Sequence, residues 1–280
     1  MSLSRTHFLF LAAMSVLVGG VAGVGPTTAA STPKPSVAFV VQCGFSHESN
    51  DDPIVHPGRS GMSHRHSFFG NSSTNASSDA RSLQSARITT CDNTDDLAAY
   101  WAPSLVDGKW DSVRAYYDAG VVDPQSIEPF PIGLGMVAGS GVGSVAWSCG
   151  RSVGAAGWTR TPTECTGGRS VTARITFPQC WDAKHRLLAQ SRHMADPVGG
   201  RCPASHPVAV PQLRIVLRTG SPRVSKALSS GSLTSMHADF LNAWRQKPFA
   251  DLVDRCIRGQ RTTSAELRSC RSKAAEPAPL

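Results

Sequence analysis

The stretch HPVAVPQLRIVLRTG, from His206 to Gly220, carries the clearest strand signal of the chain. It is rich in β-branched residues and is bounded by proline and glycine, as is typical of a β-strand between turns. Similar runs recur along the chain: VAFVVQC (37–43), ARITTC (86–91), AAYWAPSLV (98–106), VRAYYDAG (113–120), VAWSC (145–149) and VTARITFPQC (171–180). Their spacing predicts a mainly β protein, with a single-domain β-sandwich or jelly-roll-like core and long loops.

The pattern changes near the C-terminus, from residue 236 onward. In MHADFLNAWRQKPFADLVDRCIRGQ (236–260) apolar residues recur at helical intervals, and Pro248 interrupts them. We expect a short helix, a break, and a second helix that starts near Pro248. A last helix around SAELRSC (264–270) should precede a frayed end. The polar stretch GNSSTNASSDARS (70–82) is expected to form a loop. The glycine-rich stretch FPIGLGMVAGSGVGS (130–144) suits close backbone packing better than a phosphate-binding loop.

The first 30 residues have the pattern of a secretory signal peptide. Arg5 precedes the apolar run FLFLAAMSVLVGGVAGV (8–24), and small residues follow at TTAA (27–30). We expect the signal peptide at 1–30, a tether and the start of the first strand at 31–41, the β-rich domain at 42–257, and a helical, then frayed tail at 258–280. No later segment approaches the roughly 18 apolar residues of a membrane span. A secreted, extracellular protein is predicted.

All eight cysteines follow the expected cleavage point, which in an exported chain predicts four disulfides. No pair has the CxxC spacing of a zinc ribbon or a redox site. Because short loops close most easily, we expect pairing in sequence order. The expected pairs are Cys43 with Cys91, Cys149 with Cys165, Cys180 with Cys202, and Cys256 with Cys270.

The stretch GMSHRHSFFG (61–70) is the main candidate for a functional site. On extended chain, His64 and His66 would point to the same side, and we expect Phe68 to anchor the opposite face in the core. In MHADF (236–240), His237 and Asp239 form a second pair, in which the carboxylate can tune the imidazole as a general base. We expect the two segments to converge in one cleft.

Three interpretations of this cleft stay open. In the first, His64, His66 and His237 bind a divalent metal ion, with Asp239 or Asp52 as a carboxylate ligand. In the second, His64, His66, His237 and Asp239 are catalytic residues that use acid–base chemistry on a glycan, by hydrolysis or elimination. In the third, the histidines only hydrogen-bond the loop backbone.

Substrate-binding residues are expected among His193, on the rim of the cleft, Tyr100, Trp101 and Asp52. Tyrosines and tryptophans could form a sugar-stacking platform, although for each tryptophan a place in the core is the favoured interpretation. The candidates are Tyr100, Trp101, Trp110, Tyr116, Tyr117, Trp147, Trp158, Trp181 and Trp244. No acid pair typical of glycosidases stands out, and there is no GxSxG.

The net charge of +8 comes mostly from scattered basic residues. It favours attraction to anionic envelope polymers, and without a basic stripe or a recognition motif we expect no nucleic-acid binding. Two function classes follow: a cell-envelope protein that binds a polysaccharide or another anionic polymer through a histidine and aromatic cleft, or a glycan-active hydrolase or lyase with histidine chemistry and a divalent metal at His64 and His66.

A series of motifs, in order, resembles the domain of unknown function 1996 family, from about Gln42 to Cys256. The motifs are DPIVHPG, HRHSFFG, TTC, AAYWAPSL, AYY, FPIGLGMVAG, FPQCWD, RHMADP, CPASHPVAVPQL and HADFLNAW. The resemblance implies a secreted protein associated with the cell surface or with polysaccharide. It implies no particular activity.

Overall fold

The computed structural model describes residues 38–139, 144–150, 157–162, 164–223, 225–259 and Cys270. The expected signal peptide, the last expected helix apart from Cys270, and the frayed end all lie outside these residues. The described residues belong to one compact unit, Lys34–Leu280.

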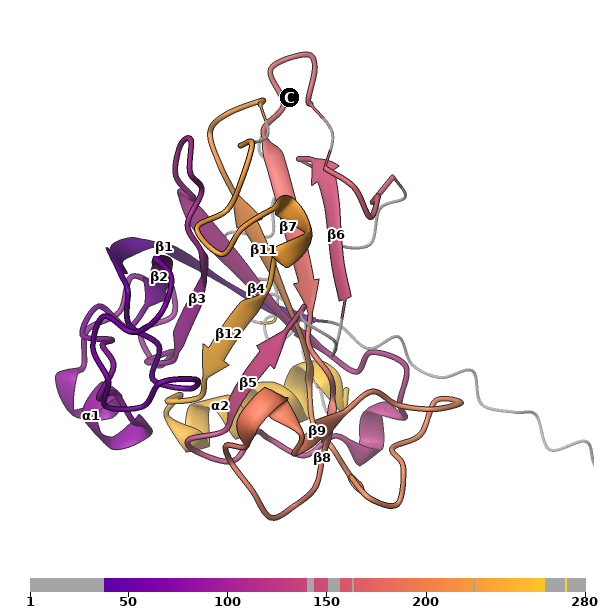
Figure 1. The fold of residues 1–280 in the computed structure, drawn as a ribbon. Coiled ribbons are helices and arrows are strands. Elements are labelled where there is room, and N and C mark those ends of the chain that lie inside the picture. Colours follow the sequence, from indigo (N-terminus) through magenta and orange to yellow (C-terminus); the bar gives the residue numbers. More distant parts are fainter. Residues whose placement is uncertain are drawn as a thin grey trace, which may run out of the picture. The chain divides into compact units, whose positions relative to one another are not determined.

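The unit is built on one nine-stranded antiparallel sheet, with strand order β5-β12-β3-β2-β1-β4-β11-β7-β6 (Figure 1). Its strands are β1 Phe39–Ser49, β2 His66–Gly70, β3 Ala99–Pro103, β4 Ser112–Asp118, β5 Gly135–Ala138, β6 Ser144–Cys149, β7 Val171–Thr176, β11 Gln212–Arg218 and β12 Ala238–Leu241. The sheet is nearly barrel-like. The prediction of a mainly β fold with a helical C-terminal segment is confirmed.

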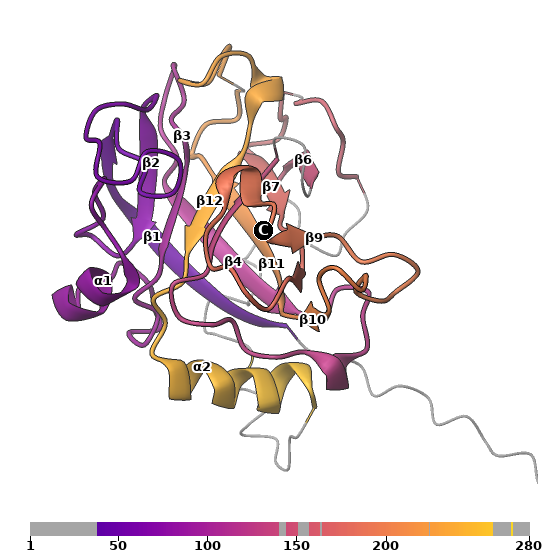
Figure 2. The same cartoon turned by 60° about the horizontal axis from the view of Figure 1, so that its bottom comes forward.

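Smaller elements complete the unit. A second sheet, of order β10-β8-β9, is formed by β8 Cys180–Trp181, β9 Met194–Ala195 and β10 Val208–Ala209. The helices are α1 Ala80–Ala86, α2 Gln246–Leu252, the π-helical η4 Val253–Ile257, and the 3-10 turns η1 Pro124–Ser126, η2 Ala189–Ser191 and η3 Leu233–Ser235. Helix α2 lies at one end of the large sheet (Figure 2). There the Phe249 ring packs 5.8 Å from the Phe39 ring and 5.7 Å from the Tyr117 ring.

The two faces of the large sheet have different surroundings. The inward face packs into the main hydrophobic core, to which all nine strands contribute side chains such as Phe69, Tyr117 and Phe240. The outward side chains of β2, β3, β12 and β5, among them Phe68 and Trp101, form a second, smaller core. Long loops cover this second core, so polar residues on the same outward face can also be buried.

Three local predictions differ from the structure. The polar stretch 70–82 contains the start of α1, because Asp79 accepts a hydrogen bond from the backbone nitrogen of Ser82 and caps the helix. ARITTC, which was expected to be a strand, has only isolated bridges, at Thr89 and Cys91. The glycine-rich stretch, for which no element was expected, contains β5. The expected first C-terminal helix is strand β12, because residues 238–241 pair with both β3 and β5. The helix expected near Pro248 is present as α2.

The four disulfides have the predicted pairing in sequence order: Cys43–Cys91, Cys149–Cys165, Cys180–Cys202 and Cys256–Cys270. They are compatible with an extracellular protein. Among the described residues, no helix has the length and apolar character that crossing a membrane requires.

Candidate functional site

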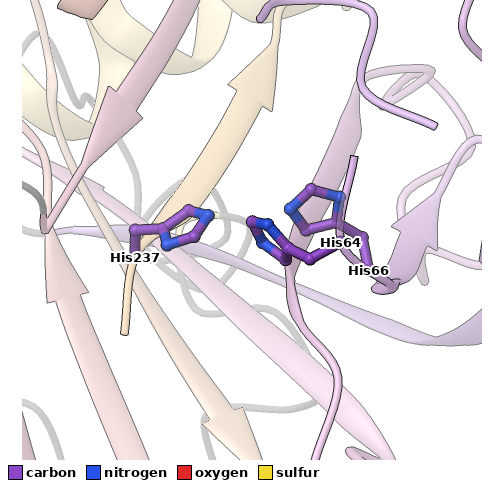
Figure 3. Close-up of side chains that lie close together, drawn as sticks. All are labelled: His64, His66 and His237. Atoms are coloured by element: carbon purple, nitrogen blue, oxygen red, sulfur yellow. The ribbon is translucent and has the colours of Figure 1, made fainter. Parts of the chain in front are cut away.

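The structure brings His64, His66 and His237 together on the outward face of the sheet (Figure 3). The ring centroids lie 4.2 Å apart for His64 and His66, 5.0 Å for His64 and His237, and 5.8 Å for His66 and His237. One ring nitrogen from each histidine lies within 4.8 Å of one from each of the others. Two segments about 170 residues apart in the chain therefore meet, as the expected convergence requires.

His66 is held by the sheet and His64 by the loop before it. His66 is the first residue of β2, and it pairs with Ser49 of β1 and Pro103 of β3. His64 precedes the strand, so only one of the two imidazoles stands on regular extended chain. Phe68 shares the face of His66, with ring centroids 6.1 Å apart, and not the opposite face that we expected. Residues two apart in a strand point to the same side.

Two aspartates shape the loop that returns His64 to the sheet. Asp52 accepts hydrogen bonds from the backbone nitrogens of Ile54 and Val55, both at 2.9 Å. Asp51 accepts from the backbone nitrogen of Gly61 at 2.9 Å and from that of Ala76 at 3.2 Å. These bonds close the loop, which therefore presents His64 beside His66.

His237 reaches the same place through strand pairing. It directly precedes β12, and Gly139, at the end of β5, packs against it. A Cβ atom at position 139 would lie 2.8 Å from the Cα of His237 and 2.6 Å from the carbonyl oxygen of Met236. The chain therefore needs glycine at this point, where φ is +109°.

Backbone carbonyls set the orientation of two of the rings. The Nδ1 atom of His66 lies 3.2 Å from the carbonyl oxygen of Asp51, and the Nδ1 atom of His237 lies 2.8 Å from that of Ser235. Each Nδ1 therefore carries the proton and donates it, which leaves a lone pair on each Nε2. A histidine that ligates a metal has this arrangement, with one nitrogen bound to a backbone oxygen and the other free to ligate.

Burial keeps the imidazoles neutral. Burial, and then the charge of His237, lowers the pKa of His64 to about 4. Burial, and then the charges of His64 and His237, lowers the pKa of His66 to about 3. Burial also lowers the pKa of His237. All three are therefore neutral at pH 7, which is the form that binds metal.

Two carboxyl groups complete the cluster. Asp239 is fully buried beside Trp101 of β3, its partner across the strands, and its Oδ2 lies 3.9 Å from the Nε2 of His237. Asp52 and Asp239 each offer an oxygen within 4.8 Å of a ring nitrogen of His66. Burial, and then the charge of Asp52, raises the pKa of Asp239 well above its usual value, and burial raises that of Asp52.

Several buried polar atoms here have no hydrogen-bond partner. They are His64 Nε2, His66 Nε2, Trp101 Nε1 and both carboxylate oxygens of Asp239. Buried polar atoms are normally paired, because an unpaired one loses its hydration without compensation. Lone pairs from imidazole and carboxylate that face one another are a donor set that fits a divalent transition-metal ion.

A pocket of about 380 Å³ gives solvent access to the cluster. His64, His237 and Asp239 line it, whereas His66 is not among its lining residues. The other lining residues are Asp52, Val55, His56, Ser63, Val137, Ser230 and Ser235. Sequence reasoning missed His56, which stands in the motif DPIVHPG, and Ser230 and Ser235, which carry no recognisable signal. Ser63 stands in the predicted stretch 61–70.

The structure places three other predicted residues away from this pocket. His193 is fully buried and not on a rim, because its Nε2 bonds the carbonyl oxygen of Gly135 at 2.8 Å. Tyr100 and Trp101 are fully buried as well. The Tyr100 hydroxyl donates to Asp96 at 2.7 Å, and the Trp101 ring stacks on Phe68. Among the described residues, no phenylalanine, tyrosine or tryptophan lines the pocket.

Comparisons with known proteins bear on the family. No curated protein and no solved structure matches the chain. A family model described as "Domain of unknown function (DUF1996)" matches residues 52–244. The match includes every residue of the cluster, from Asp52 to Asp239. Since it spans more than half of the chain, the chain belongs to the domain of unknown function 1996 family.

Proposed function

We propose that the protein is secreted to the cell envelope and binds a divalent transition-metal ion through His64, His66 and His237. The observation that carries the proposal is the convergence of three neutral imidazoles beside two carboxyl groups, with buried lone pairs that lack a partner. Zinc and copper suit an imidazole-rich site, whereas calcium and magnesium prefer oxygen ligands.

The pocket supports a second candidate, a metal-dependent hydrolase or lyase that acts on a glycan. Structural zinc sites are closed by four protein ligands, whereas catalytic sites have three and keep one position open. Here the pocket reaches His64 and His237, so a substrate could approach from the solvent side. A bound divalent ion supplies Lewis acidity. Asp52 and Asp239 would then hold the imidazoles and a substrate hydroxyl in place.

A polysaccharide remains a proposed partner, but its aromatic platform cannot lie in the histidine pocket. The aromatic rings expected there, Tyr100 and Trp101, are in the core. A sugar in this pocket would contact the hydroxyl, carboxyl and imidazole groups of the lining residues, and the side chains of Val55 and Val137.

Metal binding is tested by titrating the mature, disulfide-bonded protein with Zn²⁺ and Co²⁺. We expect about one equivalent to bind with a visible Co²⁺ spectrum typical of nitrogen and oxygen ligands. His66→Gln and His237→Gln should each weaken binding by about tenfold or more. Incubation of the loaded protein with cell-wall glycans, followed by analysis of new reducing or unsaturated ends, tests the second candidate.

His193→Gln is the matched control. This histidine is also fully buried, and its Nδ1 also lacks a hydrogen-bond partner, but it lies outside the cluster. Its replacement should leave metal binding unchanged. The proposal fails if the wild-type protein takes up no Zn²⁺ or Co²⁺, or if all three variants bind as the wild type does.

A further inference from the structure

The outward face of β4, β7 and β11 carries four arginines around one valine. The strand register places Val216 of β11 opposite Arg114 of β4 on one side and Arg174 of β7 on the other. Arg214 and Arg218 lie two residues before and after Val216, so they point to the same face. We call these four arginines the arginine face. The three strands lie side by side in Figure 1.

Little negative charge compensates the arginine face. Asp118 is the only acidic residue among the outward residues of these three strands as the structure describes them, and it pairs with Arg214. The Nε atoms of Arg214 and Arg218 are buried and have no hydrogen-bond partner. Like charges on adjacent strands destabilise a sheet. The arrangement therefore favours a bound anion.

The pKa values are consistent with this crowding. Burial, and after it the charge of Arg214, lowers the pKa of Arg174. Burial, and after it the charge of Arg114, lowers the pKa of Arg218. Arg174 therefore interacts with Arg214, and Arg218 interacts with Arg114.

The neighbours of the arginine face have the chemistry of a sugar site. The Trp158 ring lies 4.6 Å from the Arg174 guanidinium, and Trp158 is partly exposed. Tyr116, also partly exposed, is the cross-strand partner of Arg214. Gln42 accepts a hydrogen bond from Arg114 Nε at 2.9 Å. Aromatic rings, an amide and fork-shaped guanidinium groups together suit a polymer of sugars that carries carboxylates.

We propose that the arginine face binds an acidic polysaccharide, whose carboxylates pair with the arginines while its sugar rings stack on Trp158 and Tyr116. The remaining outward residues of the three strands are uncharged: Ser112, Thr172, Thr176 and Gln212. This spacing fits a polymer with isolated charges better than a nucleic acid, which presents a continuous row of phosphates. The proposal does not depend on the metal site, because it uses none of its residues.

The test measures binding of the mature protein to short oligogalacturonate by isothermal titration. Sulfated oligosaccharide, polyphosphate, single-stranded DNA and a neutral glucan oligomer serve as comparisons. We expect oligogalacturonate to bind, the neutral oligomer not to bind, and added salt to weaken the binding. Tighter binding of DNA or polyphosphate than of either acidic sugar would overturn the proposal, and so would the absence of binding to oligogalacturonate.

A variant with Arg114→Gln and Arg218→Gln should bind oligogalacturonate about tenfold or more weakly. The matched control is Arg81→Gln with Arg87→Gln, which removes the same charge. Both control residues are exposed; Arg81 lies in helix α1 and Arg87 at its C-terminal cap, and neither belongs to the arginine face. The affinity of this control variant for oligogalacturonate should change by less than about twofold. An equal loss in both double variants would show that net charge alone attracts the sugar and would refute a site.

Two further variants distinguish a loss of binding contacts from a loss of the fold. Arg114→Lys with Arg218→Lys keeps the charge but loses the paired geometry of the guanidinium, so it should also weaken binding. Trp158→Ala should weaken binding to oligogalacturonate and leave the arginines in place. If both variants are folded by circular dichroism and bind as tightly as the wild type, the proposed contacts are wrong.

Discussion

Replacing Asp96 by asparagine should change how the stability of the protein depends on pH. Asp96 is fully buried, and its carboxyl accepts hydrogen bonds from the Tyr100 hydroxyl at 2.7 Å and from the backbone nitrogen of Ala98 at 3.1 Å. Tyr100 in turn bonds the Tyr117 hydroxyl, to which Trp244 Nε1 donates at 3.1 Å. Burial outweighs these bonds and raises the pKa of Asp96 from 3.8 to about 8.

The sign of the effect follows from proton binding. Between the unfolded and the folded pKa values, the folded protein holds a proton on Asp96 that the unfolded chain has lost. Folding stability therefore falls as pH rises through this window and levels off above about pH 8. The slope is at most about 1.4 kcal/mol per pH unit, which amounts to roughly 1.5 kcal/mol between about pH 6.5 and pH 8.

Above about pH 6.5, the effect of Asp96 on stability can be distinguished from that of the histidines. The folded pKa values of His64 and His66, about 4 and about 3, lie below the ordinary value of 6.5. These histidines therefore make stability rise with pH, and their contribution is complete once pH exceeds that ordinary value. Above about pH 6.5, these histidines therefore no longer offset the loss of folding stability that Asp96 causes.

Urea unfolding of the metal-free, disulfide-bonded protein, followed by tryptophan fluorescence at several pH values, measures the effect. Asp96→Asn keeps an oxygen acceptor but cannot titrate, so the stability of the wild type relative to this variant should fall by roughly 1.5 kcal/mol across the window. Asp107→Asn, at an exposed site, is the control and should keep the wild-type slope. If Asp96→Asn and the wild type have the same slope, Asp96 is ionised in the folded protein and the reasoning is refuted.

Two further predictions concern the scaffold. Replacing Cys43 and Cys91 together by serine should lower the free energy of unfolding by about 2–5 kcal/mol, because this disulfide closes the longest loop of the four, with a separation of 48 residues; a loss below about 1 kcal/mol in urea unfolding would contradict this. Gly139→Ala should destabilise by about 1–3 kcal/mol, because its Cβ would meet backbone atoms beside His237. Gly61→Ala is the control, with a positive φ but open space, so its thermal midpoint should fall less.

Much of the scaffold follows from local sequence. Alternating β-branched runs bounded by proline and glycine predicted β4, β6, β7 and β11, because the side-chain period of a strand is visible in a single segment. Pro248 marked the start of α2, since proline suits the first turn of a helix. The disulfide pairs were predictable because each joins neighbouring cysteines in sequence order. The convergence of His64 and His66 also depends on residues close in the chain.

Only tertiary structure decided the elements and sites that depend on distant partners. Phe240 and Leu241 suit a helical period, yet they form β12 because β3 and β5 lie on either side. This pairing buries Asp239 with the histidines and gives the site its carboxylate. In the sequence the arginines of β4, β7 and β11 are scattered single charges, and the register of three strands gathers them around Val216. Strand register joins residues far apart in the chain, so the sequence order alone does not show which side chains become neighbours.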